Sequence, residues 1–289
     1  MKLCRFQMGA ATDAAPRPGL ILEDRAVVDL SAAGPTSLTA WLELEDLADR
    51  LRLLAVSSLP RQDLTQVHLL RPVEHQEVWA AGVTYLRSKS ARMEESDFSA
   101  TAYDRVYAAP RPELFFKSLP EKVAGPGEFV GIRRDARWNV PEPELALVLN
   151  SRGQVVGYTI GNDMSSRDIE GENLLYLPQA KIYRHSCALG PWIQVGATEA
   201  QAREWTVHLE IRRAGGPVFS GDTAIANIKR TFVELAEYLF RSQDFPHGAV
   251  LLTGTGIVPA EDFTLRQGDE VEIQISGIGR LVNPVQVVE

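Results

Sequence analysis

The stretch from Val140 to Asp168 constrains the fold of this chain more than any other. It reads VPEPELALVLNSRGQVVGYTIGNDMSSRD. The apolar run Leu145–Leu149 predicts a buried strand, and Asn150–Gly153 has the composition of a turn. A second strand is predicted from Gln154 to Thr159, so the stretch indicates an antiparallel hairpin.

This hairpin is expected to carry three acidic side chains on one face. A turn centred on Ser151 and Arg152 places Glu144 opposite Thr159 and Glu142 opposite Gly161. Asp163 then lies just beyond Gly161 on the second strand. Because side chains alternate along a strand, Glu142, Glu144 and Asp163 then point to the same side. A register slip of one residue would turn Asp163 to the other face.

Three carboxylates on one face point to a bound cation. They repel one another unless positive charge lies between them, and oxygen ligands suit a hard divalent cation such as Mg²⁺, Mn²⁺ or Ca²⁺. Acids at strand ends are also commonly solvated, and a pair of glutamates one residue apart carries little information alone. The residues by themselves leave both readings open.

Composition narrows the class of protein. A chain of 289 residues suffices for one large domain, or for a large and a small one. The formal net charge of −8 argues against a nucleic-acid partner. The two cysteines, Cys4 and Cys187, form no disulfide framework or zinc cluster and fit a reducing cytoplasm. With no signal peptide at the start and no apolar run of about 18 residues, we expect a cytoplasmic protein without a membrane partner.

The pattern along the chain predicts a small domain over residues 1–72 and a larger domain over residues 73–289. The first contains short strands and an amphipathic helix predicted over Leu38–Val56. The last 80 or so residues are expected to be mostly β. They include one predicted helix, which spans Ile225–Leu239.

Several polar residues outside the hairpin have two interpretations each. The charged segment Lys89–Arg105 is either an exposed helix or a lid over a site. Glu113 shares a strand face with Phe115, so it is either partly desolvated, with a raised pKa, or an edge acid in water. Lys181 is either a buried cation or a surface lysine. The turn around Thr255 either contacts an anion or is purely structural.

Six motifs occur in an order that resembles the fumarylacetoacetate hydrolase superfamily: E-P-E-L-A, G-Y-T-I-G-N-D-M-S-S-R-D, A-K, L-G-P-W-I, L-L-T-G-T-G and G-D-E-V-E-I. The resemblance implies an α+β, mostly β fold, a mixed β-roll catalytic domain with a small N-terminal α/β domain, assembled as a homodimer or homotetramer. It implies that Glu142, Glu144 and Asp163 bind Mg²⁺ or Mn²⁺. It also implies that Lys181 and Thr255 contact a small 2-oxo acid substrate.

The stretch Gly82–Ala91 departs from the hydrolases of that superfamily. Those enzymes carry G-x-N-Y-x-x-H-x-x-E, whose His–Glu pair activates water, whereas this chain reads GVTYLRSKSA. Ser88 stands in the place of the histidine and Ala91 in that of the glutamate. Neither side chain takes a proton from water near neutral pH, so the hydrolytic base is absent.

The motifs GVTYLRS, ARMEES and RPELFFK are instead similar to the 2-keto-3-deoxy-D-arabinonate dehydratase branch, which acts in pentose oxidation. This similarity implies a hydro-lyase in which Glu113 moves protons together with Lys181. The expected reaction converts a 2-keto-3-deoxy-pentonate to 2,5-dioxopentanoate and water, through proton abstraction at C3 and a metal-stabilised enolate. We expect Arg87 and Ser88 to bind substrate hydroxyls or the carboxylate.

Two alternatives stay open at this level. An acylpyruvate hydrolase or an oxaloacetate-type decarboxylase would keep the metal and take its base from Glu94 or Glu95. A catalytically silent oxo-acid binding protein would need no base. The three acids argue against the silent protein, because binding alone rarely needs a Lewis acid.

Overall fold

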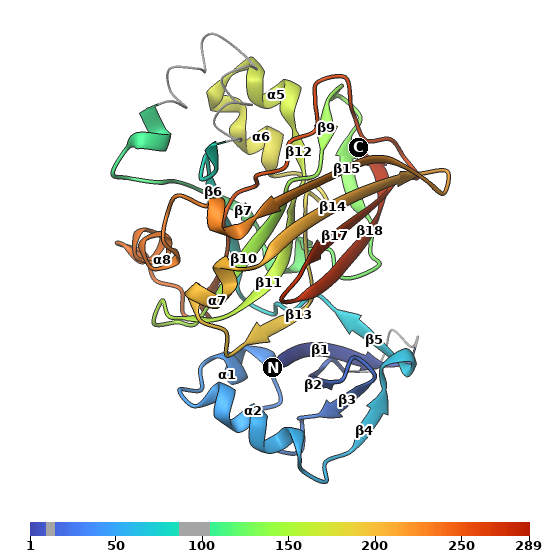
Figure 1. Ribbon diagram of the computed structural model, residues 1–289, viewed down its shortest axis with the longest axis vertical. Helices are drawn as coiled ribbons and strands as arrows, with labels where there is room; N and C mark the ends of the chain where they lie inside the picture. The colour runs from blue at the N-terminus through green and yellow to red at the C-terminus, as the bar shows by residue number, and fades with distance from the viewer. Residues whose placement is uncertain (10–14, 87–104) are drawn as a thin grey trace.

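The computed structural model describes residues 1–9, 15–86 and 105–289 (Figure 1). The predicted lid, Lys89–Arg105, therefore lies almost wholly outside the described residues. The strands are β1 (Lys2–Met8), β2 (Arg17–Leu22), β3 (Ala26–Asp29), β4 (Arg61–Asp63), β5 (Val67–Leu70), β6 (Glu77–Gly82), β7 (Glu113–Ser118), β8 (Val130–Arg133), β9 (Asn139–Val140), β10 (Pro143–Leu149), β11 (Val155–Asp163), β12 (Ser165–Ser166), β13 (Cys187–Val195), β14 (Thr206–Arg213), β15 (Gly216–Ala224), β16 (Ala249–Leu252), β17 (Glu270–Ile275) and β18 (Gly279–Val288). The helices are α1 (Leu38–Leu42), α2 (Leu47–Ala55), α5 (Arg167–Glu172), α6 (Leu177–Lys181), α7 (Glu199–Arg203) and α8 (Phe232–Phe240), with short 3₁₀ turns η1 (Leu64–Gln66), η2 (Pro120–Lys122), η3 (Leu174–Tyr176) and η4 (Ile225–Asn227).

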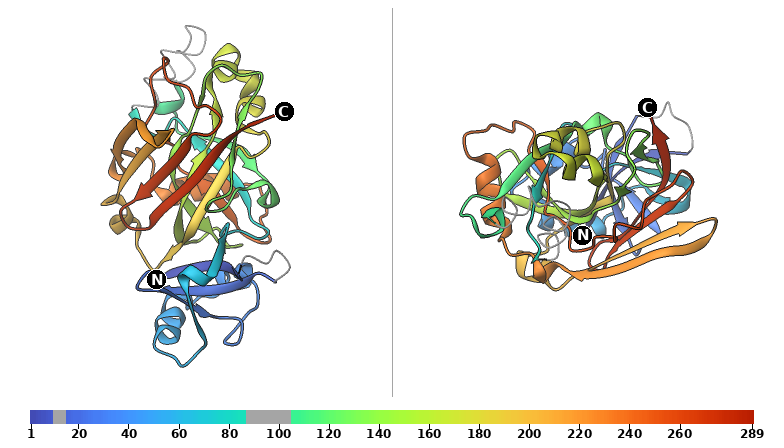
Figure 2. Two further views of the ribbon diagram at one scale, coloured as in Figure 1. Left: turned by 90° about the vertical axis from the view of Figure 1, so that its right-hand side faces the viewer. Right: turned by 90° about the horizontal axis from the view of Figure 1, so that it is seen from above.

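A long mixed sheet runs through the molecule in the order β4-β3-β2-β1-β13-β11-β10-β16-β6-β7, and β5 also pairs with β1. Strands β16 and β6 pair in parallel, whereas the pairs β11–β10, β10–β16, β13–β11 and β6–β7 are antiparallel. The N-terminal strands join this sheet where Lys2 pairs with Gln194. Elements before residue 72 gather at one end of the molecule, and α5 and α6 lie at the other (Figures 1 and 2).

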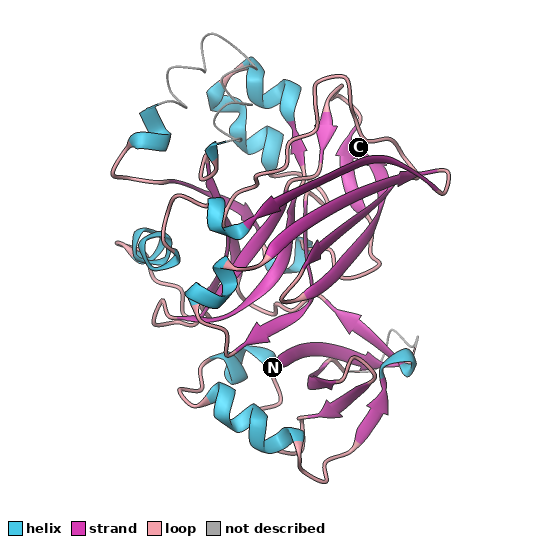
Figure 3. Ribbon diagram, in the orientation of Figure 1, coloured by secondary structure: helices cyan, strands magenta, loops and turns pink. Residues whose placement is uncertain are grey.

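A second sheet, β15-β14-β17-β18-β8, lies against the long one and closes the roll (Figure 3). The central strand β10 is buried along its whole length because both of its faces pack against apolar side chains. Leu145 and Leu147 face the core shared with the second sheet, whereas Ala146 and Val148 face the core shared with α1. This mixed, mostly β roll confirms the predicted fold class.

Two helix predictions were wrong in extent. The helix expected over Leu38–Val56 is broken into α1 and α2, because Glu43 ends α1 and accepts hydrogen bonds from the amide and hydroxyl of Ser151, at 2.8 and 2.7 Å. The helix expected over Ile225–Leu239 is interrupted after η4. Helix α8 begins only at Phe232, and the hydroxyl of Thr231 caps its N-terminus. Tertiary contacts and capping override the apolar spacing in both cases.

Over the described ranges, the structure has no helix that is long and apolar enough to cross a membrane.

Candidate metal centre and active site

The β10–β11 hairpin has a different register from the predicted one. Glu144 pairs with Gly161 rather than with Thr159, and the amide of Asp163 donates to the carbonyl of Glu142 at 3.0 Å. A three-residue loop shifts the pairing by one residue, and the bulge beside Val148 shifts it by one more. Because the two shifts add to an even number, every side chain keeps its predicted face.

Three buried carboxylates converge at the open end of this hairpin. Glu142, Glu144 and Asp163 offer oxygen atoms that lie within 4.8 Å of one another. The three residues are 4%, 2% and 1% exposed. The structure thus brings together the acids that the hairpin pattern placed on one face, and the solvated alternative does not hold.

Burial makes this acidic cluster electrostatically costly. Desolvation raises the pKa of Glu144 well above its usual value, and the charges of Asp163 and Glu142 raise it further. The ammonium of Lys181 and the amide of Gly254, which donates to Glu144 Oε2 at 2.5 Å, act in the opposite direction. Three hard oxygen donors of like charge are a donor set that fits a divalent cation such as Mg²⁺.

Lys181 is a buried cation rather than a surface lysine. It ends α6 and is 1% exposed. Its Nζ donates to Glu142 Oε2 at 2.9 Å, to Asp163 Oδ2 at 3.2 Å and to Ser165 Oγ at 2.6 Å. The ammonium therefore lies against two of the three acids, within reach of anything that binds there.

Two further cations contact the acids, and the sequence reasoning assigned neither a role. Lys117 Nζ lies 2.5 Å from Asp163 Oδ1 and also donates to the carbonyl oxygens of Met164 and Lys181. Arg167 Nη2 donates to Glu142 Oε1 at 2.8 Å. The sequence held one signal for Lys117. It lies two positions after Phe115 and four after Glu113, so strand alternation places it on the same face as Glu113. The structure shows it fully buried there.

Glu113 begins β7 and lies on the strand face that meets the acids. On this face, Lys117 pairs with Asp163, and the Phe115 ring centroid lies 5.9 Å from Lys181 Nζ. Glu113 itself is half-buried and pairs with Gly82 of β6. The structure therefore directs Glu113 toward the same side as the metal centre, which favours the partly desolvated interpretation over an edge acid in water.

The remaining predicted site residues have different outcomes. Thr255 is 2% exposed, and its hydroxyl exchanges hydrogen bonds of 3.2 Å with the carbonyl and amide of Ile257. The neighbouring amide of Gly254 binds the chain's own carboxylate, that of Glu144. Arg87 and Ser88 lie outside the described residues, so their substrate contacts stay predictions.

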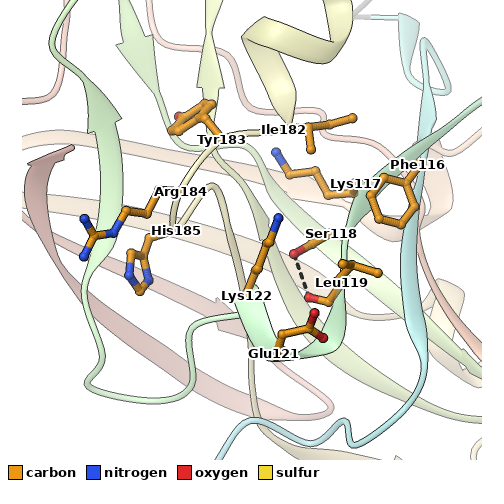
Figure 4. A pocket seen from close by; sticks show the side chains of 10 residues that line it. All are labelled: Phe116, Lys117, Ser118, Leu119, Glu121, Lys122, Ile182, Tyr183, Arg184 and His185. Atoms are coloured by element: carbon orange, nitrogen blue, oxygen red, sulfur yellow. Dashed lines mark hydrogen bonds between the residues drawn. The ribbon is translucent and has the colours of Figure 1, made fainter. Parts of the chain in front are cut away.

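A cavity of about 410 Å³ lies between the end of β7 with η2 and the loop after α6, with Lys117 in its wall (Figure 4). Its lining is largely apolar and includes Phe116, Leu119 and Ile182. None of the three acids lines it. The three acids and the cations that contact them therefore form a site separate from this cavity.

The ion pair between Lys117 and Asp163 predicts a large stability effect. Lys117→Ala leaves a buried carboxylate without one of its partners, which typically costs about 3–5 kcal/mol. Urea unfolding in the presence of a chelator measures this loss. The matched control is Lys122→Ala, which removes an exposed lysine five residues away. Equal unfolding free energies for both variants would contradict a structural role for the Lys117 ion pair.

Comparison with known proteins defines the class of this fold and site. Residues 77–286 match the family model described as fumarylacetoacetate (FAA) hydrolase C-terminal, and the chain belongs to this family.

Particular relatives are more informative still. The chain is 47% identical over 221 residues to a probable 2-keto-3-deoxyxylonate dehydratase of Haloferax volcanii, which covers 76% of each chain. It is 38% identical over 271 residues to the 2-dehydro-3-deoxy-D-arabinonate dehydratase of Saccharolobus solfataricus, covering 92% of this chain and 91% of that protein. A solved 2-keto-3-deoxy-D-arabinonate dehydratase, complexed with magnesium and 2,5-dioxopentanoate, superimposes with a TM-score of 0.82 at 32% identity over the full length of both chains.

These findings confirm the resemblance that the motifs carried. Dehydratases are lyases, so the predicted enzyme class is confirmed as well. The magnesium in the solved relative agrees with the predicted cofactor and with the donor set of the three acids.

Proposed function

We propose that the protein is a Mg²⁺-dependent dehydratase that converts a 2-keto-3-deoxy-pentonate into 2,5-dioxopentanoate and water. The observation that carries this proposal is the cluster of three buried acids in contact with Lys181, together with Glu113, whose carboxylate lies over Gly82 of the neighbouring strand β6. The names of the most similar relatives support the same reaction.

We assign the metal-ligand role to Glu142, Glu144 and Asp163. Lys117, Arg167 and Lys181 form ion pairs with Glu142 and Asp163, and the ammonium of Lys181 also acts on Glu144 through its charge. A divalent cation held by the three acids would add positive charge to this site, which would attract an anionic sugar acid. When bound, magnesium supplies Lewis acidity that makes the C–H bond beside a keto group more acidic.

The proton transfers fall to this chain's own residues. Glu113 removes a proton from C3, the C4–oxygen bond breaks, and the hydroxyl leaves as water with a proton that Lys181 donates. A proton is then removed from C5 and one returns to C3, which gives the enol of the terminal aldehyde. This enol becomes 2,5-dioxopentanoate when C4 takes up a proton and the enol hydroxyl loses one. The sum of these steps is the loss of one water molecule. Arg87, Ser88 and Thr255 are proposed to bind the substrate's oxygen atoms.

A substrate panel tests the proposal. Purified protein with Mg²⁺ is offered 2-keto-3-deoxy-pentonates, 2-keto-3-deoxy-hexonates and an acylpyruvate, and NMR identifies each product. The dehydratase forms 2,5-dioxopentanoate from a pentonate and leaves the acylpyruvate intact. Cleavage of the acylpyruvate with no turnover of the sugar acids would favour a hydrolase, whose base would be Glu94 or Glu95, outside the described residues.

A further inference from the structure

Gly82 lies directly beneath the carboxylate of Glu113. The two residues are paired across β6 and β7. A β-carbon placed on Gly82 would lie 2.1 Å from Glu113 Oε2 and 2.6 Å from its Cδ. Real β-carbons do not approach other atoms so closely, so the carboxylate occupies space that only glycine leaves open. The side chain of Glu113 thus extends sideways over β6, toward β16 and β10.

The sheet surface on that side leads to the metal centre. Gly254 follows β16, and its amide donates to Glu144 Oε2 at 2.5 Å. It has φ +89°, and a β-carbon there would lie 2.1 Å from Thr84 Oγ1, two residues beyond Gly82. Gly254 therefore packs against the chain just beyond Gly82 and at the same time binds Glu144, so a short stretch of backbone links the residue beneath Glu113 to the metal centre.

We propose that Gly82 is a positioning residue that seats the Glu113 carboxylate over β6 and turns it toward the three acids. This inference rests on the proposed function, because it takes Glu113 to be the group that moves the substrate's protons. A methyl group at this position displaces the carboxylate, and a misplacement of about 1 Å can cost about 100-fold in rate.

The test compares Gly82→Ala with variants of Glu113. Gly82→Ala is expected to lower kcat about 100-fold while the Mg²⁺ affinity, measured by calorimetry, stays within about twofold. In the Glu113→Gln background, the added Gly82→Ala is expected to change the residual rate by less than about twofold, because the proton-transfer group is already gone. In the Glu113→Asp background, the shorter side chain leaves room for the methyl group, so the penalty shrinks to about tenfold or less.

The matched control is Gly157→Ala, another glycine of the long sheet, whose β-carbon would lie 2.5 Å from Ile193 Cγ2. We expect it to lower stability but not the kcat of the folded protein. An unchanged kcat for Gly82→Ala, or equal penalties in all Glu113 backgrounds, would overturn the positioning role alone. Full turnover by Glu113→Gln would remove the proton-transfer role of Glu113 and this inference with it, whereas failure of the wild-type protein to dehydrate any 2-keto-3-deoxy-pentonate would overturn the proposed function, so the two failures are distinguishable.

Arg230 holds the chain segment just before Glu113. It is 8% exposed, and its guanidinium donates to the carbonyl oxygens of Ala109, Pro110 and Val106, at 2.6, 3.1 and 3.4 Å. These carbonyls belong to the end of the helical turn at residues 105–108 and the link into β7. A cation bound to such carbonyls satisfies acceptors that a helix end leaves without intrahelical partners.

The segment that Arg230 holds forms one wall of a cavity of about 440 Å³. Val106, Ala109 and Glu113 line this wall, and Leu174 and Leu177 also line the cavity. From the separate set of hydrogen bonds to this wall, we infer that Arg230 is a second positioning residue for Glu113. This inference also depends on the proposed function.

Replacement with an unbranched apolar side chain tests this role. Arg230→Met is expected to lower kcat about tenfold with a smaller change in KM, whereas Arg230→Lys recovers part of the loss. The control is Arg241→Met, which removes an exposed arginine beyond α8 that lies over the Tyr238 ring. The effect of Arg230→Met is expected to vanish in the Glu113→Gln background. An undiminished effect there, or an unchanged kcat for Arg230→Met alone, would overturn the inference.

Discussion

Glu113→Gln is expected to abolish turnover while the protein still binds its substrate. The amide is nearly isosteric with the carboxylate, so the side chain is expected to keep its position over Gly82 and the shape of the 440 Å³ cavity that it lines. It cannot take a proton, however, and a positioned general base typically contributes about 10²–10⁴-fold to the rate. Steady-state kinetics measure the fall in kcat, and calorimetry with Mg²⁺ measures binding of the sugar acid.

A matched control separates this effect from a general change in charge. Glu121→Gln removes an exposed carboxylate from η2, just after β7, and should leave kcat unchanged. If Glu113→Gln kept wild-type turnover, Glu113 would have no part in proton transfer. The base would then have to be sought elsewhere, beginning with Glu94 and Glu95.

Glu144→Ala is expected to remove magnesium binding and activity together. Glu144 is one of only three acids that meet at this point among the described residues, and each supplies an oxygen to the cluster. Mutation of a residue that only hydrogen-bonds to a metal ligand typically lowers metal affinity about 10–100-fold. Loss of a direct ligand is therefore expected to lower Mg²⁺ affinity by more than about 100-fold. Calorimetric titration with Mg²⁺ detects this loss without any assay of turnover.

The control for Glu144→Ala is Glu172→Ala, which removes an exposed acid at the end of α5. That variant should bind Mg²⁺ with wild-type affinity. Retention of both Mg²⁺ binding and turnover by Glu144→Ala would show that the three acids are not the metal centre.

The hairpin and its three acids were predictable because strand alternation is a local rule. The face of each acid depends only on whether the register shift is even or odd, so two unforeseen shifts left the prediction of a shared face intact. The exact pairing of Glu144 was not predictable, because it depends on the loop conformation and on a bulge that the composition of the turn does not specify.

The surroundings of the acids were harder to predict, because they come from elements far apart in the chain. Lys117 and Lys181 belong to β7 and α6, and only the folded sheet brings them to Asp163. A lysine next to an apolar run looks the same in sequence whether it is buried or exposed. The break between α1 and α2 has a similar origin, since Glu43 binds the turn of a hairpin more than one hundred positions later.

The choice among reactions rests on residues outside the hairpin. Enzymes with different chemistries can use the same cluster of acids, so the metal centre alone does not distinguish a dehydratase from a hydrolase or a decarboxylase. The proposed distinction lies in Glu113 of β7 and in the missing hydrolytic pair at Ser88 and Ala91. The central claim is therefore that Glu113 moves the substrate's protons beside the metal centre.

Dehydration of a 2-keto-3-deoxy-pentonate in heavy water with Mg²⁺, followed by NMR, tests this claim most directly. The wild-type protein is expected to form 2,5-dioxopentanoate that carries solvent deuterium at C3, and Glu113→Gln is expected to form none on the same timescale. Equal rates of product formation by the two proteins would contradict the claim.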